Sequence, residues 1–137
     1  MRVLLLIIGV LSASLAQAGG LLVVVSPKVP DSEISLEQLA NIYTMKKVFW
    51  TNKIRVVPIN HRVASEERKR FSKAVFNLSP KEVGDYWNRL RYQGKLPPVI
   101  QASDQAVLGF VRRVPGAIGY INANQKPAGV KILLRLP

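Results

Sequence analysis

The 137-residue chain has no cysteine and a single histidine, His61. Without cysteine there is no disulfide framework, no thiol nucleophile and no zinc site built on thiolates. One histidine also excludes a metal site that needs several imidazole ligands. The glycine-rich fingerprints that bind nucleotide phosphates or dinucleotides are missing as well. We therefore expect neither a metal nor an organic cofactor.

Acidic residues are scarce, with 8 Asp+Glu against 20 Lys+Arg and a formal net charge of +12. A field of this sign attracts phosphate, nucleic acid, acidic glycans and membrane surfaces, and it also serves solubility. The charge by itself selects none of these partners. No motif of a nucleic-acid-binding fold accompanies it, so we expect no nucleic-acid partner.

Long apolar runs are missing beyond the first residues of the chain. Met1 and Arg2 give a positive start, residues 3–11 form an apolar run, and Ala16-Gln17-Ala18 has the small-x-small pattern of a signal-peptidase site. The run is shorter than the roughly 20 residues that a transmembrane helix needs. The pattern predicts a cleaved signal peptide over residues 1–18 and a periplasmic or secreted protein.

Residues 19–137 are predicted to form one α/β domain of ordinary size. Runs of apolar and β-branched residues predict strands near residues 21–26, 54–60, 99–101, 117–121 and 130–134. Capping signals predict helices that begin after Ser35, Ser65, Ser79 and Ser103. Because strands alternate with helices, we expect a mixed or parallel sheet covered by helices.

The loop at residues 60–65 is the strongest candidate site, because it joins a predicted strand to a predicted helix. In open α/β sheets, ligands bind beyond the C-terminal ends of strands. A helix start offers free backbone N–H groups and a positive dipole end to an anion. The Ser65 hydroxyl and the Arg62 guanidinium would complete an oxyanion site, with His61 and Arg68 beside them.

An ordinary structural interpretation of the same loop stays open. Ser65 would then only cap the helix, and Arg62 would be solvated. Glu66 and Glu67 already place two negative charges at this helix start, where they favour the helix dipole and would repel a bound oxyanion.

Two other patterns suggest an enzyme and a base-stacking loop, and an ordinary structural explanation is favoured for each. His61 and Ser65 are near enough in sequence to suggest a base and a nucleophile, but no nucleophile-elbow motif accompanies them. We therefore expect no enzymatic activity. Phe49 and Trp50 follow two lysines, a mixture that would suit base stacking, but we favour a loop whose two aromatic rings plug the core.

The order of these pieces resembles the phosphate-type substrate-binding proteins of ABC transporters. The resemblance is carried by residues 36–43 (LEQLANIY), by Lys46-Lys47 with Trp50, and by residues 54–59 (IRVVPI). Residues 61–71 (HRVASEERKRF) lie where the ligand loop and its helix would be, and residues 114–121 (VPGAIGYI) match the closing strand. The resemblance implies a single periplasmic-binding-protein-like lobe of type 2 that binds phosphate or another oxyanion for ABC transport.

By this resemblance, Ser65 takes the place of a ligand-contacting serine, and Arg62 lies near an arginine of the family. The partner would be a membrane permease or another envelope protein. The chain departs from the family where Ser65 is followed by Glu66-Glu67 rather than by Gly-Thr, and residues 19–137 resemble one lobe of two. The alternative function is a non-catalytic interaction module that keeps the fold without the ligand.

Overall fold

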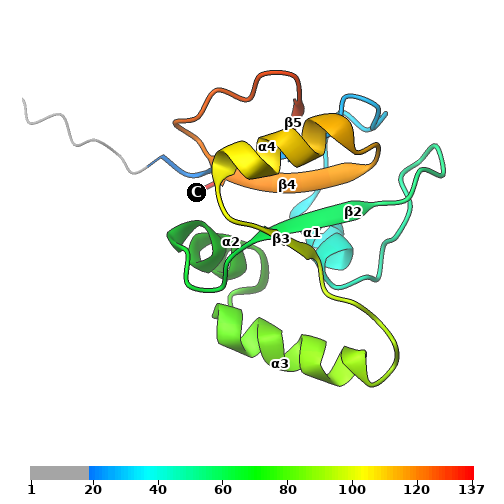
Figure 1. Cartoon of the computed structure of the whole chain (residues 1–137), viewed down its shortest axis with the longest axis vertical. Helices are drawn as coiled ribbons and strands as arrows, with labels where there is room; N and C mark the ends of the chain where they lie inside the picture. The colour runs from blue at the N-terminus through cyan, green and yellow to red at the C-terminus, as the bar shows by residue number, and fades with distance from the viewer. Residues whose placement is uncertain (1–18) are drawn as a thin grey trace, which may run out of the picture.

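The computed structural model describes residues 19–137, so the predicted signal peptide lies outside the described residues. Within that range the chain forms one five-stranded sheet with helices on both faces (Figure 1). No helix of residues 19–137 is both long enough and apolar enough to cross a membrane. The elements, in chain order, are β1 (Leu21–Val25), α1 (Leu36–Tyr43), β2 (Val57–His61), α2 (Glu66–Phe76), α3 (Pro80–Arg91), β3 (Val99–Gln101), α4 (Asp104–Arg113), β4 (Ala117–Asn122) and β5 (Lys131–Leu136).

The strand order is β3-β2-β4-β1-β5. β2 is parallel to both of its neighbours, whereas β1 is antiparallel to β4 and to β5. The prediction of a mixed sheet covered by helices is therefore confirmed. The strand predicted from residue 54 begins later, at Val57, because the Val56 N–H bonds the carbonyl of Val48 and Arg55 forms a bridge with Phe49.

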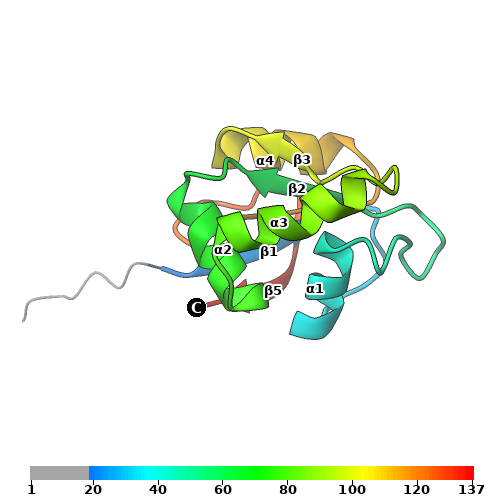
Figure 2. The same ribbon diagram turned by 90° about the horizontal axis from the view of Figure 1, so that it is seen from below.

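The core has two layers, one on each face of the sheet. β1 lies between them and is buried along its whole length, so its side chains alternate between the two layers. α4 covers one face, while α1 and α2 cover the other. α3 packs on α2 and lies farther from the sheet, as Figures 1 and 2 show. This offset leaves room between α3 and the end of β2.

The four helix starts fall where the capping serines predict them. The hydroxyls of Ser35, Ser65, Ser79 and Ser103 each accept a hydrogen bond from the backbone N–H three residues on, at 3.1–3.3 Å. Each bond satisfies one of the N–H groups that a helix start leaves without a partner. The signal is local in sequence, and that is why it places these starts correctly.

The two aromatic side chains of the loop before β2 differ in burial. Trp50 is buried, and its Nε1–H donates to the carbonyl of Gly116 at 2.9 Å, so its predicted role as a core plug is confirmed. The same prediction for Phe49 is wrong, because Phe49 is 50% exposed. Adjacent residues in an extended segment point to opposite sides, so only one of the two rings can enter the core.

Candidate functional site

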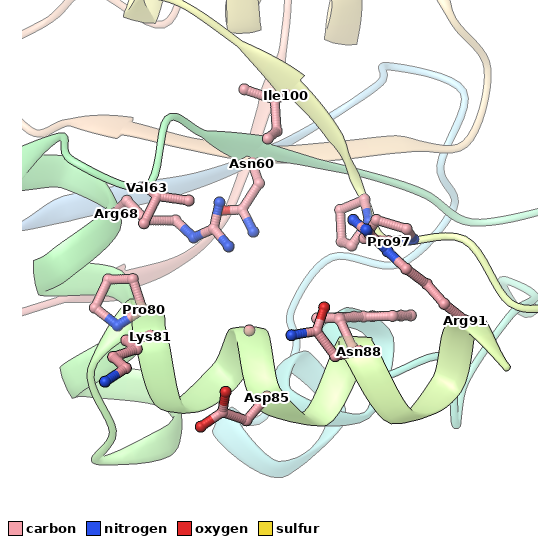
Figure 3. A pocket seen from close by; sticks show the side chains of 13 residues that line it. Asn60, Val63, Arg68, Pro80, Lys81, Asp85, Asn88, Arg91, Pro97 and Ile100 are labelled. Atoms are coloured by element: carbon pink, nitrogen blue, oxygen red, sulfur yellow. The ribbon is translucent and has the colours of Figure 1, made fainter.

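A cavity of about 360 Å³ lies between the C-terminal end of β2 and α3 (Figure 3). Asn60 on β2, Val63 in the following loop and Arg68 on α2 form one wall. α3 forms the opposite wall, where Asn88 and Arg91 lie. The cavity thus lies where parallel-strand topology predicts a ligand, beyond the C-terminal end of the parallel strand β2.

Four charged side chains line this cavity, Arg68, Lys81, Asp85 and Arg91, and Arg68 is the buried one among them, at 7% exposed. Its Nη1 donates to the carbonyl of His61 at 2.8 Å. Among the described residues, carboxylates form ion pairs only with His61 and with Lys69, so none neutralises Arg68. Burial lowers the pKa of Arg68, because a guanidinium loses hydration there. A buried charge without a counter-ion is unfavourable, and an anion in the cavity would relieve it.

Asn60 is buried beside Arg68 and is held in one orientation. Its Oδ1 accepts a hydrogen bond from the hydroxyl of Tyr120. With that oxygen engaged, the Nδ2 group is the free donor of the amide. Figure 3 shows the side-chain ends of Asn60 and Arg68 close together on the sheet side of the cavity. Their N–H groups form a cluster of donors that suits an oxyanion.

Ser65 and Glu67 occupy the start of α2 themselves. The Ser65 hydroxyl accepts from the Arg68 N–H at 3.1 Å and donates to the carbonyl of Arg62 at 2.8 Å. The Glu67 carboxylate accepts from Asn122 Nδ2 at 2.8 Å. Its own backbone N–H and Asn122 lower the pKa of Glu67. The positive end of α2 therefore already has a carboxylate, supplied by the chain.

His61 points its ring away from the cavity and into the protein. The ring is buried, with Nε2 lying 2.8 Å from the carbonyl oxygen of Tyr120 and 3.5 Å from Oδ1 of Asp104. Its backbone carbonyl, by contrast, holds Arg68. The structure thus brings His61 and Ser65 to Arg68: the His61 carbonyl accepts from the guanidinium, and the Ser65 hydroxyl accepts from the Arg68 backbone N–H. Ser65 itself does not line the cavity. The Arg62 side chain is exposed and lies outside the cavity wall.

Sequence reasoning missed the parts of the site that depend on tertiary structure. The sequence pattern predicts Asn60 only as the first residue of the loop, although a polar residue at the end of an apolar strand is itself a signal of a site. The basic residues at the end of α3 are explained by the helix dipole, and only the packing of α3 shows that Arg91 also faces the cavity.

In Glu67→Gln, the free energy of unfolding should fall less steeply than in the wild type as the pH is lowered from 7 to 3. The folded pKa of Glu67 lies below its ordinary value, so the unfolded chain takes up the proton first as the pH falls. The stabilisation is thus complete above the ordinary pKa of about 4.3 and disappears as the pH falls through the folded value. Urea unfolding from pH 7 to pH 3 measures this, with the exposed Glu66→Gln as the control. Parallel curves for wild type and Glu67→Gln would contradict the assignment.

No protein-family model matches the chain, and no curated protein matches it in sequence. Several solved structures share its fold. An ABC-type phosphate transport receptor from Vibrio cholerae matches with a TM-score of 0.67 and 17% identity over 84% of this chain and 45% of that chain. PstS from Borrelia burgdorferi matches with a TM-score of 0.64 and 19% identity, over 84% and 46%.

A third structure contains a ligand. It is a Clostridium perfringens protein assigned as a phosphate ABC transporter substrate-binding protein, with bound phosphate; the TM-score is 0.67 and the identity 19%, over 84% of this chain and 44% of that chain. The chain thus spans less than half the length of these structures. At such identities the likeness is one of fold, and it confirms the predicted α/β fold of periplasmic-binding-protein type.

Proposed function

We propose that residues 19–137 form an exported, non-catalytic domain that binds a small oxyanion, with phosphate as the first candidate, between β2 and α3. The observation that carries this proposal is Arg68, a buried guanidinium that faces the cavity and has no carboxylate within ion-pair distance among the described residues. The carboxylate of Asp85, which also lines the cavity, is exposed on α3. An oxyanion would supply the missing charge and accept several N–H donors at once.

Each of the four residues predicted from the sequence has a place in this proposal. Arg68 contacts the anion, together with Nδ2 of Asn60. The His61 carbonyl and the Ser65 hydroxyl hold Arg68 in position. Arg62 lies on the exposed side of the same loop and adds to the positive field that draws anions to the cavity.

The fold and the charge support the wider biological role. Two of the three solved structures named above are described as phosphate transport proteins, one of them with phosphate bound. The predicted signal peptide and the fold both support a location in the cell envelope. A membrane permease or another envelope protein would be the partner there. We therefore propose that the domain binds an anion in the periplasm and that this binding is linked to ABC transport.

Titration calorimetry of residues 19–137 with phosphate at low ionic strength, with sulfate for comparison, tests the proposal. We expect saturable binding that Arg68→Gln weakens at least tenfold, because the anion loses its principal charged donor. Lys69→Gln is the matched control, since it removes one exposed cation from the same helix. Circular dichroism checks that Arg68→Gln is folded. Equal weakening by both variants would show a nonspecific field rather than a site.

The alternative is an interaction module that keeps the fold without the ligand. It is favoured by the Glu67 carboxylate, which takes the place at the start of α2 that an anion would otherwise fill. If wild-type protein gives no heat with phosphate or sulfate, this alternative replaces the anion proposal.

A further inference from the structure

A second hollow, of about 160 Å³, lies beside the edge of the sheet; it shares Pro97 and Pro98 with the first cavity but does not include Arg68. It arises because β3 is short. β3 pairs with residues Ile59–His61 of β2, whereas Val57 and Pro58 pair with β4 and have no strand on their other side. The chain segments 42–58 and 96–99 close around this unpaired stretch and leave a groove.

The groove has an apolar floor and an exposed apolar rim. Val56, Val57 and Pro58 line it from the strand side. Leu96 and Val99 line the other side, and they are 78% and 45% exposed. Exposed apolar side chains that gather around a concave surface are typical of an interaction site. The space suits one large apolar side chain from a partner.

The charge around the groove has one sign. Lys47 and Arg55 line it, and neither is paired with a carboxylate among the described residues. Segment 42–58 also contains Lys46 and Lys53 and has no Asp or Glu, and segment 96–99 has no charged residue. The complementary partner is therefore acidic as well as apolar.

We propose that this groove binds a short, extended segment of another protein, with one apolar side chain in the hollow and flanking Asp or Glu residues on Lys47 and Arg55. The Val57 N–H already donates to the carbonyl of Gly116 and Pro58 has no N–H, so the hollow and the two cations, rather than strand pairing, hold the segment. A second copy of the chain is a poor occupant, because its net charge of +12 repels the same surface. A bilayer surface does not enter a concave groove. The proposal is independent of the oxyanion site.

The test uses a fluorescein-labelled, N-acetylated peptide, Glu-Asp-Leu-Phe-Asp-Glu, and residues 19–137 labelled with nitrogen-15. We expect amide shifts confined to Val48, Arg55, Leu96 and Val99 and their neighbours. Anisotropy should show saturable binding that Lys47→Glu with Arg55→Glu weakens at least tenfold. Arg113→Glu is the control for charge, because it changes an exposed cation at the end of α4. Arg68→Gln should leave peptide binding unchanged, which separates this site from the oxyanion site.

A second pair of variants tests the apolar part. Leu96→Ser should weaken peptide binding at least fivefold, whereas Tyr92→Ser, at a residue that is 94% exposed and outside the groove, should not. The proposal is overturned if a peptide with Ser in place of Leu and Phe binds equally well, or if no binding occurs up to millimolar peptide. It is also overturned if Leu96→Ser instead abolishes a dimer in sedimentation or binding to phosphatidylglycerol vesicles.

Discussion

Phe71→Ala should lower the free energy of unfolding by about 3–5 kcal/mol, the usual range for truncating a buried aromatic ring. Phe71 is 2% exposed and lies on the inner side of α2. Its ring stacks on Tyr120 with the centroids 3.9 Å apart and the planes 5° from parallel. It also meets Tyr43 in an edge-on contact at 4.7 Å. Removing the ring leaves a cavity where α2 joins the sheet.

Chemical denaturation of Phe71→Ala, with Phe49→Ala as control, measures this effect. The control removes the same atoms from a ring that is 50% exposed, so its change should stay below about 1 kcal/mol. Phe71→Leu keeps most of the apolar volume and should fall between the two. If Phe71→Ala and Phe49→Ala unfold at the same denaturant concentration, the proposed stack does not hold α2 on the sheet.

Phe71 also connects the core to the candidate site, because Arg68 lies three residues earlier on α2. Residues three apart on a helix are neighbours on its surface. We therefore expect the position of Arg68 to depend on the packing of Phe71. A loosened α2 in Phe71→Ala would weaken oxyanion binding even where the protein is still folded.

Much of the fold is predictable from the sequence, because its signals are local. The capping serines place the helix starts, and the apolar run at residues 21–26 identifies the buried strand β1. The strand order and the contrast between Phe49 and Trp50 were not predictable in the same way. Both depend on which distant segments pack together, and Trp50 is fixed by the carbonyl of Gly116.

The candidate site is predictable only in part, for a physical reason. Residue types in the sequence predict a site at the loop after β2, and Arg68 lies in the cavity wall there. His61 contributes a backbone carbonyl to Arg68, and residue type says little about main-chain roles. The Ser65 hydroxyl caps the helix by accepting from the N–H of Arg68, as the structural interpretation expects. Ser65 does not line the cavity, so its contact with an anion stays a prediction. The burial of Arg68 emerges only from tertiary packing.

Tyr120→Phe is the second change for which we expect a large effect, about 2–4 kcal/mol of stability, because two buried polar groups lose their partner. The Tyr120 hydroxyl donates to Oδ1 of Asn60 and accepts from the backbone N–H of His61 at 3.2 Å. Both groups are buried. Burial raises the pKa of Tyr120, so the hydroxyl keeps its proton and remains a donor at neutral pH. Phenylalanine fills the same space but leaves both groups unsatisfied.

Tyr86→Phe is the matched control for this variant. Its hydroxyl donates to the carbonyl of Thr44 at 2.8 Å in a half-buried position, so its loss should cost only about 0.5–1.5 kcal/mol. The two variants also separate stability from site geometry. In Tyr120→Phe, Asn60 is no longer held with Nδ2 toward the cavity, so phosphate affinity should fall at least threefold at temperatures where the protein is folded. Tyr86→Phe should leave that affinity unchanged. Equal affinities in the two variants would mean that Asn60 does not contact the anion, and Arg68 alone would remain as its donor.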